Sequence, residues 1–318
     1  MSVPTPGTEA PVPIPEGLAE MAPGSQLAQV LAEIPFSRVS GHDTVELLRA
    51  AYRLATHYRT VFLAALLETG LREPFSHDSV ARVETPGEFA SEEARAALSW
   101  SRTRADSTFS LAFDVLDRLP MLGEAMLAGE LDEPRARAFV SWTEGLTDEQ
   151  AVQVCGQLLP EAPGLTVGEL IDRIKRLAIA IDPGWAERRY KEKVRGRRVA
   201  GSRNPDGTGN LHGLDLPIDR AAAASDRVDT LARDCKRGGD RRPVNHVKTD
   251  LFLGMLDGTF LGMSDAQIVA YVLEHPFVEP GDDADPGSDG HDPADSEGRT
   301  GERRAREGSA GKDAEDGA

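Results

Sequence analysis

Apolar residues recur every three or four positions through most of the chain between residues 41 and 277. This interval places them on one side of an α-helix, so the pattern predicts a succession of amphipathic helices. Residues 196–216 depart from it, and the turn sequence Asn204-Pro205-Asp206-Gly207 within them predicts a short β-hairpin. The predicted fold is mainly α, a multi-helix bundle with one short β-hairpin insertion. Helices are expected over 43–69, 91–98, 102–119, 120–129, from 133, from 147, from 166, from 183, and over 217–236, 243–257 and 264–274.

The longest predicted helix, 43–69, carries a stripe of apolar residues that we expect to face the core. The stripe consists of Val45, Leu48, Tyr52, Ala55, Phe62 and Leu66. Gly70 follows and is expected to end the helix in a left-handed conformation. Two later helices begin with capping boxes, Thr147 with Gln150 and Thr166 with Glu169.

Both ends of the chain have the composition of disordered segments. Residues 1–24 contain six prolines, and residues 279–318 contain no Val, Ile, Leu, Met, Phe, Trp or Tyr. Segments of this kind bury too little apolar surface to offset the entropy lost on ordering. The sequence therefore predicts a Pro-rich disordered segment over 1–40, one helical domain over 41–277, and a disordered acidic Gly/Asp/Pro tail over 278–318.

Composition narrows the classes of function. The 318 residues carry a formal net charge of −17, which excludes a uniformly basic nucleic-acid binder but not a local basic face. Two cysteines cannot form a disulfide scaffold or a four-cysteine zinc site. No apolar run reaches the ~20 residues that a membrane-spanning helix needs, and no secretory signal is recognisable. We expect a soluble protein of the cytoplasm with no membrane partner.

Catalytic motifs are not recognisable in the sequence. No two of the seven histidines, and no histidine and cysteine, have metal-ligand spacing. Asn245-His246 is similar to the end of a His-Asn-His nuclease motif, but it precedes a predicted helix instead of lying in a ββα-metal unit. Cys155 has apolar neighbours and is expected in the core. The chain is therefore predicted not to be an enzyme and to bind neither metal nor cofactor.

Two clusters of cations provide the one positive signal, which points to double-stranded DNA. Eight cations lie between residues 187 and 203 and are opposed there by Glu187 and Glu192, which leaves a net charge of +6. Such patches neutralise phosphates, although cations also complement helix C-termini and solvated loops. The first cluster is Arg188, Arg189, Lys191, Lys193, Arg195, Arg197, Arg198 and Arg203. The second is Arg233, Lys236, Arg237, Arg241, Arg242 and Lys248.

A second, weaker signal lies between residues 91 and 109. Two predicted helices joined by Ser99-Trp100-Ser101 have the length of a helix-turn-helix, whose second helix enters the major groove. Arg102, Arg104 and Thr108 would then face outward as DNA contacts. A short corner in an ordinary helical bundle is the alternative interpretation.

The order of these landmarks resembles a family of actinobacterial proteins called domain of unknown function 222, or thirteen-E-twelve repeat proteins. The resemblance covers roughly residues 43–275. Matching landmarks are Arg118-Leu119-Pro120, Ala128-Gly129-Glu130-Leu131-Asp132 and Arg135-Ala136-Arg137. "LLPEAPGLTVGELIDRIKRLAIAIDP" is similar to the family's next two helices, and "NPDGTGNLHGLDLP" to its short hairpin.

The resemblance implies a link to DNA, because the helical domain of this family usually precedes a C-terminal HNH nuclease. After Val278 this sequence contains one histidine, His291, and no cysteine, so no nuclease residue can be assigned. We therefore expect a non-catalytic, DNA-associated helical module. The alternatives are a truncated HNH endonuclease that has lost its catalytic domain, and a module that binds another protein or itself.

Overall fold

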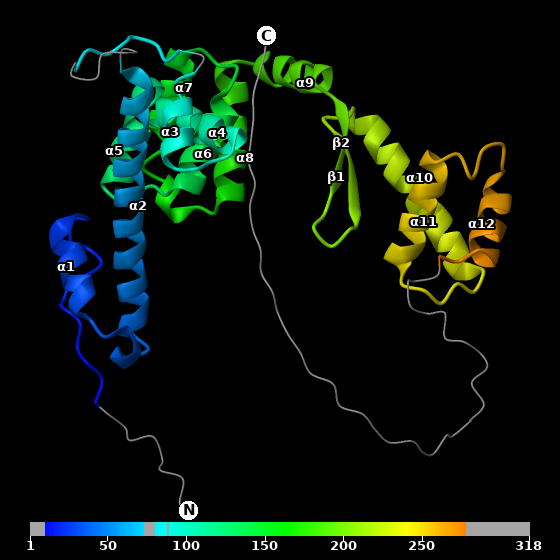
Figure 1. The fold of residues 1–318 in the computed structure, drawn as a ribbon, viewed down its shortest axis with the longest axis horizontal. Helices are drawn as coiled ribbons and strands as arrows, with labels where there is room; N and C mark the ends of the chain where they lie inside the picture. The colour runs from blue at the N-terminus through cyan, green and yellow to red at the C-terminus, as the bar shows by residue number, and fades with distance from the viewer. Residues whose placement is uncertain (1–9, 73–79, 88, 278–318) are drawn as a thin grey trace, which may run out of the picture. The chain divides into compact units, whose positions relative to one another are not determined.

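The computed structural model describes residues 10–72, 80–87 and 89–277, which are mainly helical (Figure 1). The predicted fold class is confirmed, since one two-stranded antiparallel hairpin interrupts a series of helices. The predicted acidic tail over 278–318 lies outside the described residues. The elements are α1 Ser25–Glu33, α2 Asp43–Leu71, α3 Glu92–Ala97, α4 Arg102–Phe113, α5 Pro120–Leu127, α6 Glu133–Thr143, α7 Asp148–Leu158, α8 Val167–Ile181, α9 Trp185–Arg195, β1 Arg198–Arg203, β2 Gly209–Leu214, α10 Ile218–Arg237, α11 Val244–Leu256 and α12 Asp265–Glu274.

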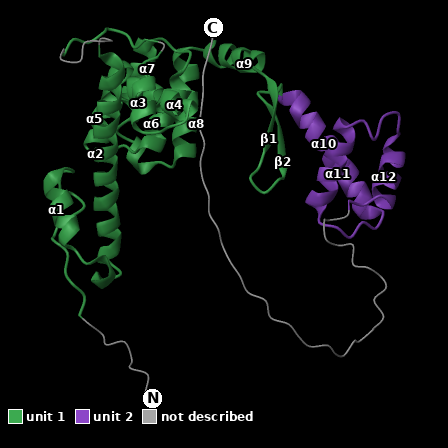
Figure 2. Ribbon diagram, in the orientation of Figure 1, with its two compact units in different colours: residues 1–217 green, residues 218–318 purple. Residues whose placement is uncertain are grey.

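The chain divides into two compact units, residues 1–217 and 218–318 (Figure 2). The sequence predicted a single helical domain over 41–277, and the structure differs because that range contains two separate apolar cores. The first core is built from α2 to α8 and the second from α10 to α12. The hairpin that precedes the boundary is exposed along nearly its whole length, so it adds to neither core.

The first unit encloses the larger core. α6 packs on α8, and α2 packs on α4 and α5. Phe139, Met126, Leu122, Leu170 and Ile174 are completely buried where these helices meet. Each such side chain contributes about 1.5–3 kcal/mol when it leaves water, so this cluster is the main source of the unit's stability.

Helix starts follow the predicted capping chemistry. The Thr147 and Thr166 hydroxyls accept the backbone N–H groups of Gln150 and Glu169. In return, the Gln150 and Glu169 side chains accept the backbone N–H groups of the two threonines, which completes both capping boxes. Asp132 caps α6 by accepting the backbone N–H of Arg135 at 3.0 Å. These residues satisfy N–H groups that have no partner within their own helix.

Asp132 also joins three parts of the first unit. Its second carboxylate oxygen accepts the Tyr52 hydroxyl of α2 at 2.8 Å and pairs with the Arg135 guanidinium. Arg135 donates in turn to the carbonyls of Ala162 and Leu165, at 3.1 and 2.7 Å, in the connection between α7 and α8. The buried carboxylate therefore has partners on every side, which is the condition for burying a charge.

The disorder predicted for residues 1–40 is wrong for residues 10–40. Leu18, together with Leu27 and Leu31 of α1, is buried against Leu47 and Ala50 of α2. Nearer the N-terminus, the backbone N–H of Val12 donates to the Arg38 carbonyl at 2.8 Å. The prolines exclude a helix before residue 25, but the apolar residues among them still have a partner surface on α2.

The apolar stripe predicted to face the core along α2 is wrong in its first half. Val45, Leu48 and Tyr52 are 52%, 67% and 53% exposed, whereas Leu47 and Ala50 are buried by α1. Farther along the helix, Phe62 and Leu66 of the same stripe do pack on the core. The helical period identified the apolar side correctly, but α1 packs on a different side.

Gly70 is not a left-handed helix end, as the sequence predicted, but a close packing position inside α2. A Cβ atom at residue 70 would lie 2.3 Å from the Phe109 ring and 2.6 Å from the Ala90 carbonyl oxygen. Glycine is therefore required because α4 and the start of α3 approach the helix backbone too closely for any side chain.

The second unit is a three-helix cluster. Leu231 and Cys235 of α10, Val247 and Leu251 of α11 and Ile268 of α12 form its centre. Within the described residues of the whole chain, no helix has the length and apolar character to cross a membrane.

Gly70→Ala should destabilise the first unit by about 1–3 kcal/mol, because overpacking forces either Phe109 or the backbone to move. Gly156→Ala is the matched control, since a Cβ in the middle of α7 meets nothing within 4 Å. The control should gain about 0.5–1 kcal/mol from helix propensity. Urea unfolding followed by tryptophan fluorescence measures both variants, because Trp100, Trp142 and Trp185 all lie in the first unit. Equal midpoints for the two variants would contradict the close packing.

Candidate nucleic-acid interface

The predicted basic run begins on α9, which a buried tryptophan attaches to the bundle. Trp185 is 2% exposed, and its indole N–H donates to the Glu144 carbonyl at 2.8 Å, at the end of α6. The helix starts there because Asp182 accepts the Gly184 backbone N–H at 3.0 Å, just before the first turn. The first turn of α9 is thus fixed to the bundle, and the cations lie in the turns that come after it.

Arg189 contributes to this attachment. Its guanidinium carbon lies 4.8 Å from the Trp142 ring centre and 5.8 Å from that of Trp185, and a guanidinium nitrogen lies 3.1 Å from the Glu144 carboxylate. The side chain is 16% exposed. Lys175 of α8 lies over the Trp142 ring at 4.2 Å. Arg189 was predicted as a DNA contact, but its guanidinium is already occupied by packing.

Four more cations of the run form ion pairs. Arg188 binds Asp182 at 2.5 Å, and the hydrogen bond from Arg188 holds the pKa of the Asp182 carboxyl below its usual value. The other pairs are Lys191 with Glu187 at 2.5 Å, Lys193 with Glu144 at 3.5 Å, and Arg198 with Asp215 at 3.5 Å. All four are surface pairs, which exchange readily with water and salt.

Three arginines of the run, Arg195, Arg197 and Arg203, form no ion pair with any part of the chain that the structure describes. Arg197 donates to the Val194 carbonyl of its own helix at 2.9 Å, which leaves its charge uncompensated. The eight cations thus meet six carboxylates, since Glu144, Asp182, Asp206 of the hairpin turn and Asp215 join Glu187 and Glu192. The net charge of this surface is +2, and the unpaired cations Arg195 and Arg197 lie where α9 leads into the hairpin.

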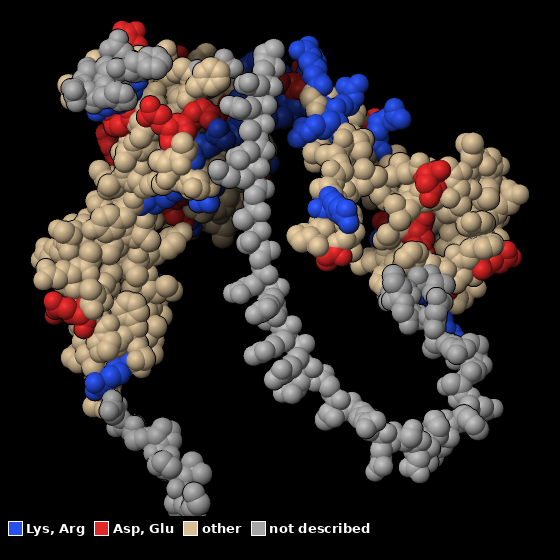
Figure 3. Space-filling view, in the orientation of Figure 1, with Lys and Arg blue, Asp and Glu red and all other residues tan. Residues whose placement is uncertain are grey.

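The hairpin presents two exposed faces. Its register pairs Arg198 with Leu214, Ala200 with His212 and Ser202 with Asn210, so these six side chains share one face. The opposite face carries Val199, Leu211 and Arg203 with three glycines. Figure 3 shows Lys and Arg side chains gathered over α9 and the adjoining hairpin. We call residues 188–214 the α9–hairpin surface.

The chain matches the family model described as Domain of unknown function (DUF222) over residues 48–263, more than half of its length. The chain belongs to this family. No curated protein and no solved structure matches it. The DUF222 match runs from the first turns of α2 past the end of α11 and includes the whole α9–hairpin surface.

The second cationic cluster, near the end of the DUF222 match, is engaged within its own unit. Arg242 binds Asp240 and Asp250, each at 2.6 Å, and Lys248 binds Asp229 at 2.6 Å. Lys236 donates to the carbonyls of Asp240 and Arg242 after the C-terminus of α10. Carboxylates also pair with Arg233 and Arg237, whereas Arg241 forms no ion pair with the described residues. These cations stabilise the α10–α11 connection, which was the alternative interpretation of this cluster.

In the DUF222 segment with helix-turn-helix length, Arg102 and Arg104 are exposed as predicted, whereas Thr108 is not. Thr108 is buried and bonded to the Arg104 carbonyl, so the prediction that it faces outward is wrong. Arg104 stacks on Trp100 at 4.4 Å, and Arg102 lies 3.6 Å from Asp106. Ser99 adopts a left-handed φ of 52° in the corner between the helices. The helical period alone predicted that Thr108 faces outward, but the side chain is buried within the bundle.

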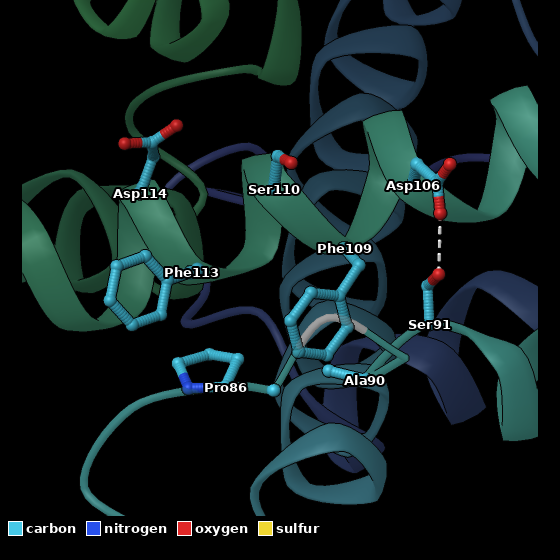
Figure 4. A pocket seen from close by; sticks show the side chains of 9 residues that line it. Pro86, Ala90, Ser91, Asp106, Phe109, Ser110, Phe113 and Asp114 are labelled. Atoms are coloured by element: carbon cyan, nitrogen blue, oxygen red, sulfur yellow. Dashed lines mark hydrogen bonds between the residues drawn. The ribbon is translucent and has the colours of Figure 1, made fainter.

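The side of α4 that borders a hollow of about 430 Å³ is acidic (Figure 4). Asp106 and Asp114 lie at its two ends, above an aromatic floor that includes Phe109. The Ser91 hydroxyl donates to Asp106 at 2.5 Å, and Asp114 binds Arg118 at 2.6 Å. Carboxylates on this side of the helix repel phosphates, so α4 is a poor candidate for the helix that enters a groove.

Among the described residues, the two thiols and His246 are not gathered with other titratable side chains into a candidate metal site. Cys155 is buried in the first core as predicted, and burial raises its pKa to about 12. Burial also raises the pKa of Cys235. His246 lies exposed in the first turn of α11. No group of three or more His, Cys, Asp or Glu side chains is placed to hold a metal ion within residues 10–72, 80–87 and 89–277.

Sequence reasoning missed the residues that give the α9–hairpin surface its character. A count of charges could not separate Arg189 from Arg195, because the aromatic partners of Arg189 are 47 and 4 positions away. The polar face with Ser202, Asn210 and His212 has a readable signal, the period-two alternation of a strand.

Asp240→Asn should remove part of the acid sensitivity of the second unit. The hydrogen bond from Arg242 lowers the pKa of the Asp240 carboxyl, whose side chain is 4% exposed. A carboxyl whose folded-state pKa lies below its unfolded value of about 3.9 stabilises the fold at higher pH. This contribution to stability is lost as the pH falls through the folded-state pKa. The variant should lose about 1–3 kcal/mol of unfolding free energy near neutral pH, because Arg242 keeps only one of its two carboxylate partners, Asp250, and its stability should respond less to acid.

Urea unfolding by circular dichroism, compared with tryptophan fluorescence for the first unit, isolates this effect. Asp226→Asn on the exposed side of α10 is the control, with a side chain 82% exposed. If Asp240→Asn lost as much stability on acidification as the native chain, Asp240 would not be the source of the acid sensitivity.

Proposed function

We propose that this DUF222 module binds double-stranded DNA through the α9–hairpin surface and cuts no strand. The supporting observation is that three arginines without ion-pair partners, Arg195, Arg197 and Arg203, surround a hairpin exposed on both faces. Arg195 and Arg197 lie where α9 leads into the hairpin and Arg203 is the last residue of β1, so a phosphate backbone that follows the ribbon would supply the counter-charges that the described chain does not.

The hairpin fits this role by its shape. A two-stranded β-ribbon enters the major groove of B-DNA, where base edges carry a readable pattern of donors and acceptors. Arg198, Ser202, Asn210 and His212 share one hairpin face and offer suitable polar groups. Glycines at 201, 209 and 213 keep the opposite face thin. An isolated hairpin is marginally stable in water, so a partner surface would also stabilise this one.

The expected affinity is modest and depends strongly on salt. The net charge of −17 repels DNA at long range, so short-range neutralisation must provide the attraction. Neutralising three phosphates predicts a slope of about −2.7 for log K against log salt concentration, at about −0.9 per phosphate. Cations that now form surface pairs, such as Arg188 and Lys193, would steepen the slope if they exchanged carboxylates for phosphates.

The non-catalytic part of the proposal rests on residue types. The histidines have no metal-ligand spacing in the sequence, and Cys155 and Cys235 are buried with raised pKa values. A buried neutral thiol is a poor nucleophile and a poor metal ligand. Strand scission by the purified chain would overturn this part without affecting the binding proposal.

A module that binds another protein or itself is the second candidate function. The exposed apolar stripe in the first half of α2 favours it.

Replacing Arg195, Arg197 and Arg203 together by Gln should flatten the salt dependence of duplex binding by about 2.7 units of slope. The control replaces Arg233, Arg237 and Arg241 by Gln, which removes the same charge from the second unit and should leave the slope unchanged. Fluorescence anisotropy with a labelled duplex between about 20 and about 200 mM salt measures both variants. The proposal fails if the native chain does not bind at the lowest salt, or if the two triple variants behave alike.

A further inference from the structure

The first half of α2 carries apolar side chains that the described part of its unit leaves largely exposed, although the Tyr52 hydroxyl is bonded to Asp132. Val45, Leu48 and Tyr52 are each more than half exposed, and Ala55 is exposed beside them. Leaving such side chains in water has a free-energy cost, and a contiguous exposed apolar patch usually marks a binding surface.

The spacing of these residues is that of a helix-pairing seam. Intervals of three, four and three residues separate Val45, Leu48, Tyr52 and Ala55. This is the alternation of the two core positions in a coiled-coil heptad, whose side chains pack between those of a facing helix. The seam covers about three turns, and it is therefore built to receive one further α-helix.

The N-terminal part of the seam is poor in charge, whereas charged groups border its C-terminal end, where the Tyr52 hydroxyl donates to Asp132 and Arg59 binds Glu133. α1 lies beside the first half of α2, away from the gathered helices α3–α8 (Figure 1). In the face shown by Figure 3, this part of the unit carries few Lys, Arg, Asp or Glu side chains. Arg49 is the exposed cation that flanks the seam. A charge-poor seam selects an equally charge-poor partner, because a charge buried against it would be unpaired.

We propose that a second copy of this chain covers the seam, with the two α2 helices antiparallel and related by a two-fold axis near residue 50. In this register Val45 faces Ala55 of the partner subunit, and Leu48 faces Tyr52 of the partner subunit. The seam is thus complementary to itself in size and in its lack of charge, and the two-fold dimer is the commonest symmetric assembly. The inference is independent of DNA binding.

The path of α2 through its own unit decides between a parallel and an antiparallel arrangement of the two helices. The same stripe continues to Phe62 and Leu66, where the chain's own bundle covers it. A parallel partner helix in register would have to pass through the space that this bundle fills. An antiparallel partner instead leaves past the N-terminal end of α2 and avoids it.

The chain's own acidic tail is a poor alternative occupant. Residues 279–318 contain no Val, Ile, Leu, Met, Phe, Trp or Tyr, so they have nothing to bury against Leu48. A three-turn seam is also small compared with the ~1,200 Å² or more of a stable interface, so the dimer should be weak and concentration-dependent.

Sedimentation velocity and light scattering of the full chain over a wide concentration range test the dimer. Leu48→Glu should weaken dimerisation at least tenfold, because it buries an unpaired charge in the seam. The matched control is Val61→Glu, which replaces a 45% exposed residue on another side of the same helix and should dimerise as the native chain does. Far-UV circular dichroism checks that both variants keep their helix content.

A charge exchange tests the direction. Val45→Glu and Ala55→Lys should each weaken the dimer, and the double variant should recover at least half of the loss, because residues 45 and 55 of the two subunits then form two ion pairs. In a parallel dimer the double variant would place like charges together and would be weaker than either single variant. A native chain that stays monomeric at every concentration, or equal effects of Leu48→Glu and Val61→Glu, would overturn the dimer.

Discussion

The first unit depends on one buried carboxylate. Asp132 caps α6, accepts the Tyr52 hydroxyl of α2 and pairs with Arg135, whose guanidinium satisfies two carbonyls between α7 and α8. Removing one partner of such a network leaves the others buried without hydrogen bonds, so the network behaves as a unit. The apolar core supplies more free energy, but this network fixes how α2, α6 and α8 meet.

A similar logic separates structural cations from available ones on the α9–hairpin surface. Trp185 attaches α9 to the end of α6, and Arg189 fills the space between Trp185 and Trp142. The helix then extends away from these aromatic rings, so Arg195 at its last residue contacts no ring or carboxylate of the described chain. Arg195 is therefore available because Arg189 is engaged, since the anchored turn directs the remaining turns toward solvent.

The sequence was a good guide wherever the cause was local. Thr147 and Thr166 cap their helices as predicted because the capping bonds span three residues. The turn at Gly207, with its φ of 89°, likewise depends on a few neighbouring residues. Both kinds of signal are complete within a short window of sequence.

Predictions failed where the cause was a partner far along the chain. The period of α2 identified its apolar side, but α1 packs on another side and leaves Leu48 exposed. The contact of Leu18 and Leu27 with α2 was not predicted, because the proline content of the N-terminal segment indicated disorder. Charge counting likewise could not find Glu144, which neutralises two cations more than forty residues away. Apart from helix α1, which formed in a segment predicted to be disordered, these failures concern which surfaces meet and not which elements form.

The two exposed features of the first unit call for different partners, and this difference makes them thermodynamically separable. The seam on α2 is apolar and poor in charge, so salt should change its occupancy little, whereas the α9–hairpin surface acts through ions that salt displaces. A dimer whose two ribbons could reach one duplex would form its second DNA contact at a high effective concentration. Linkage would then require DNA to strengthen that dimer by the same factor by which dimerisation strengthens DNA binding, whereas a dimer whose ribbons cannot reach one duplex would show no such coupling.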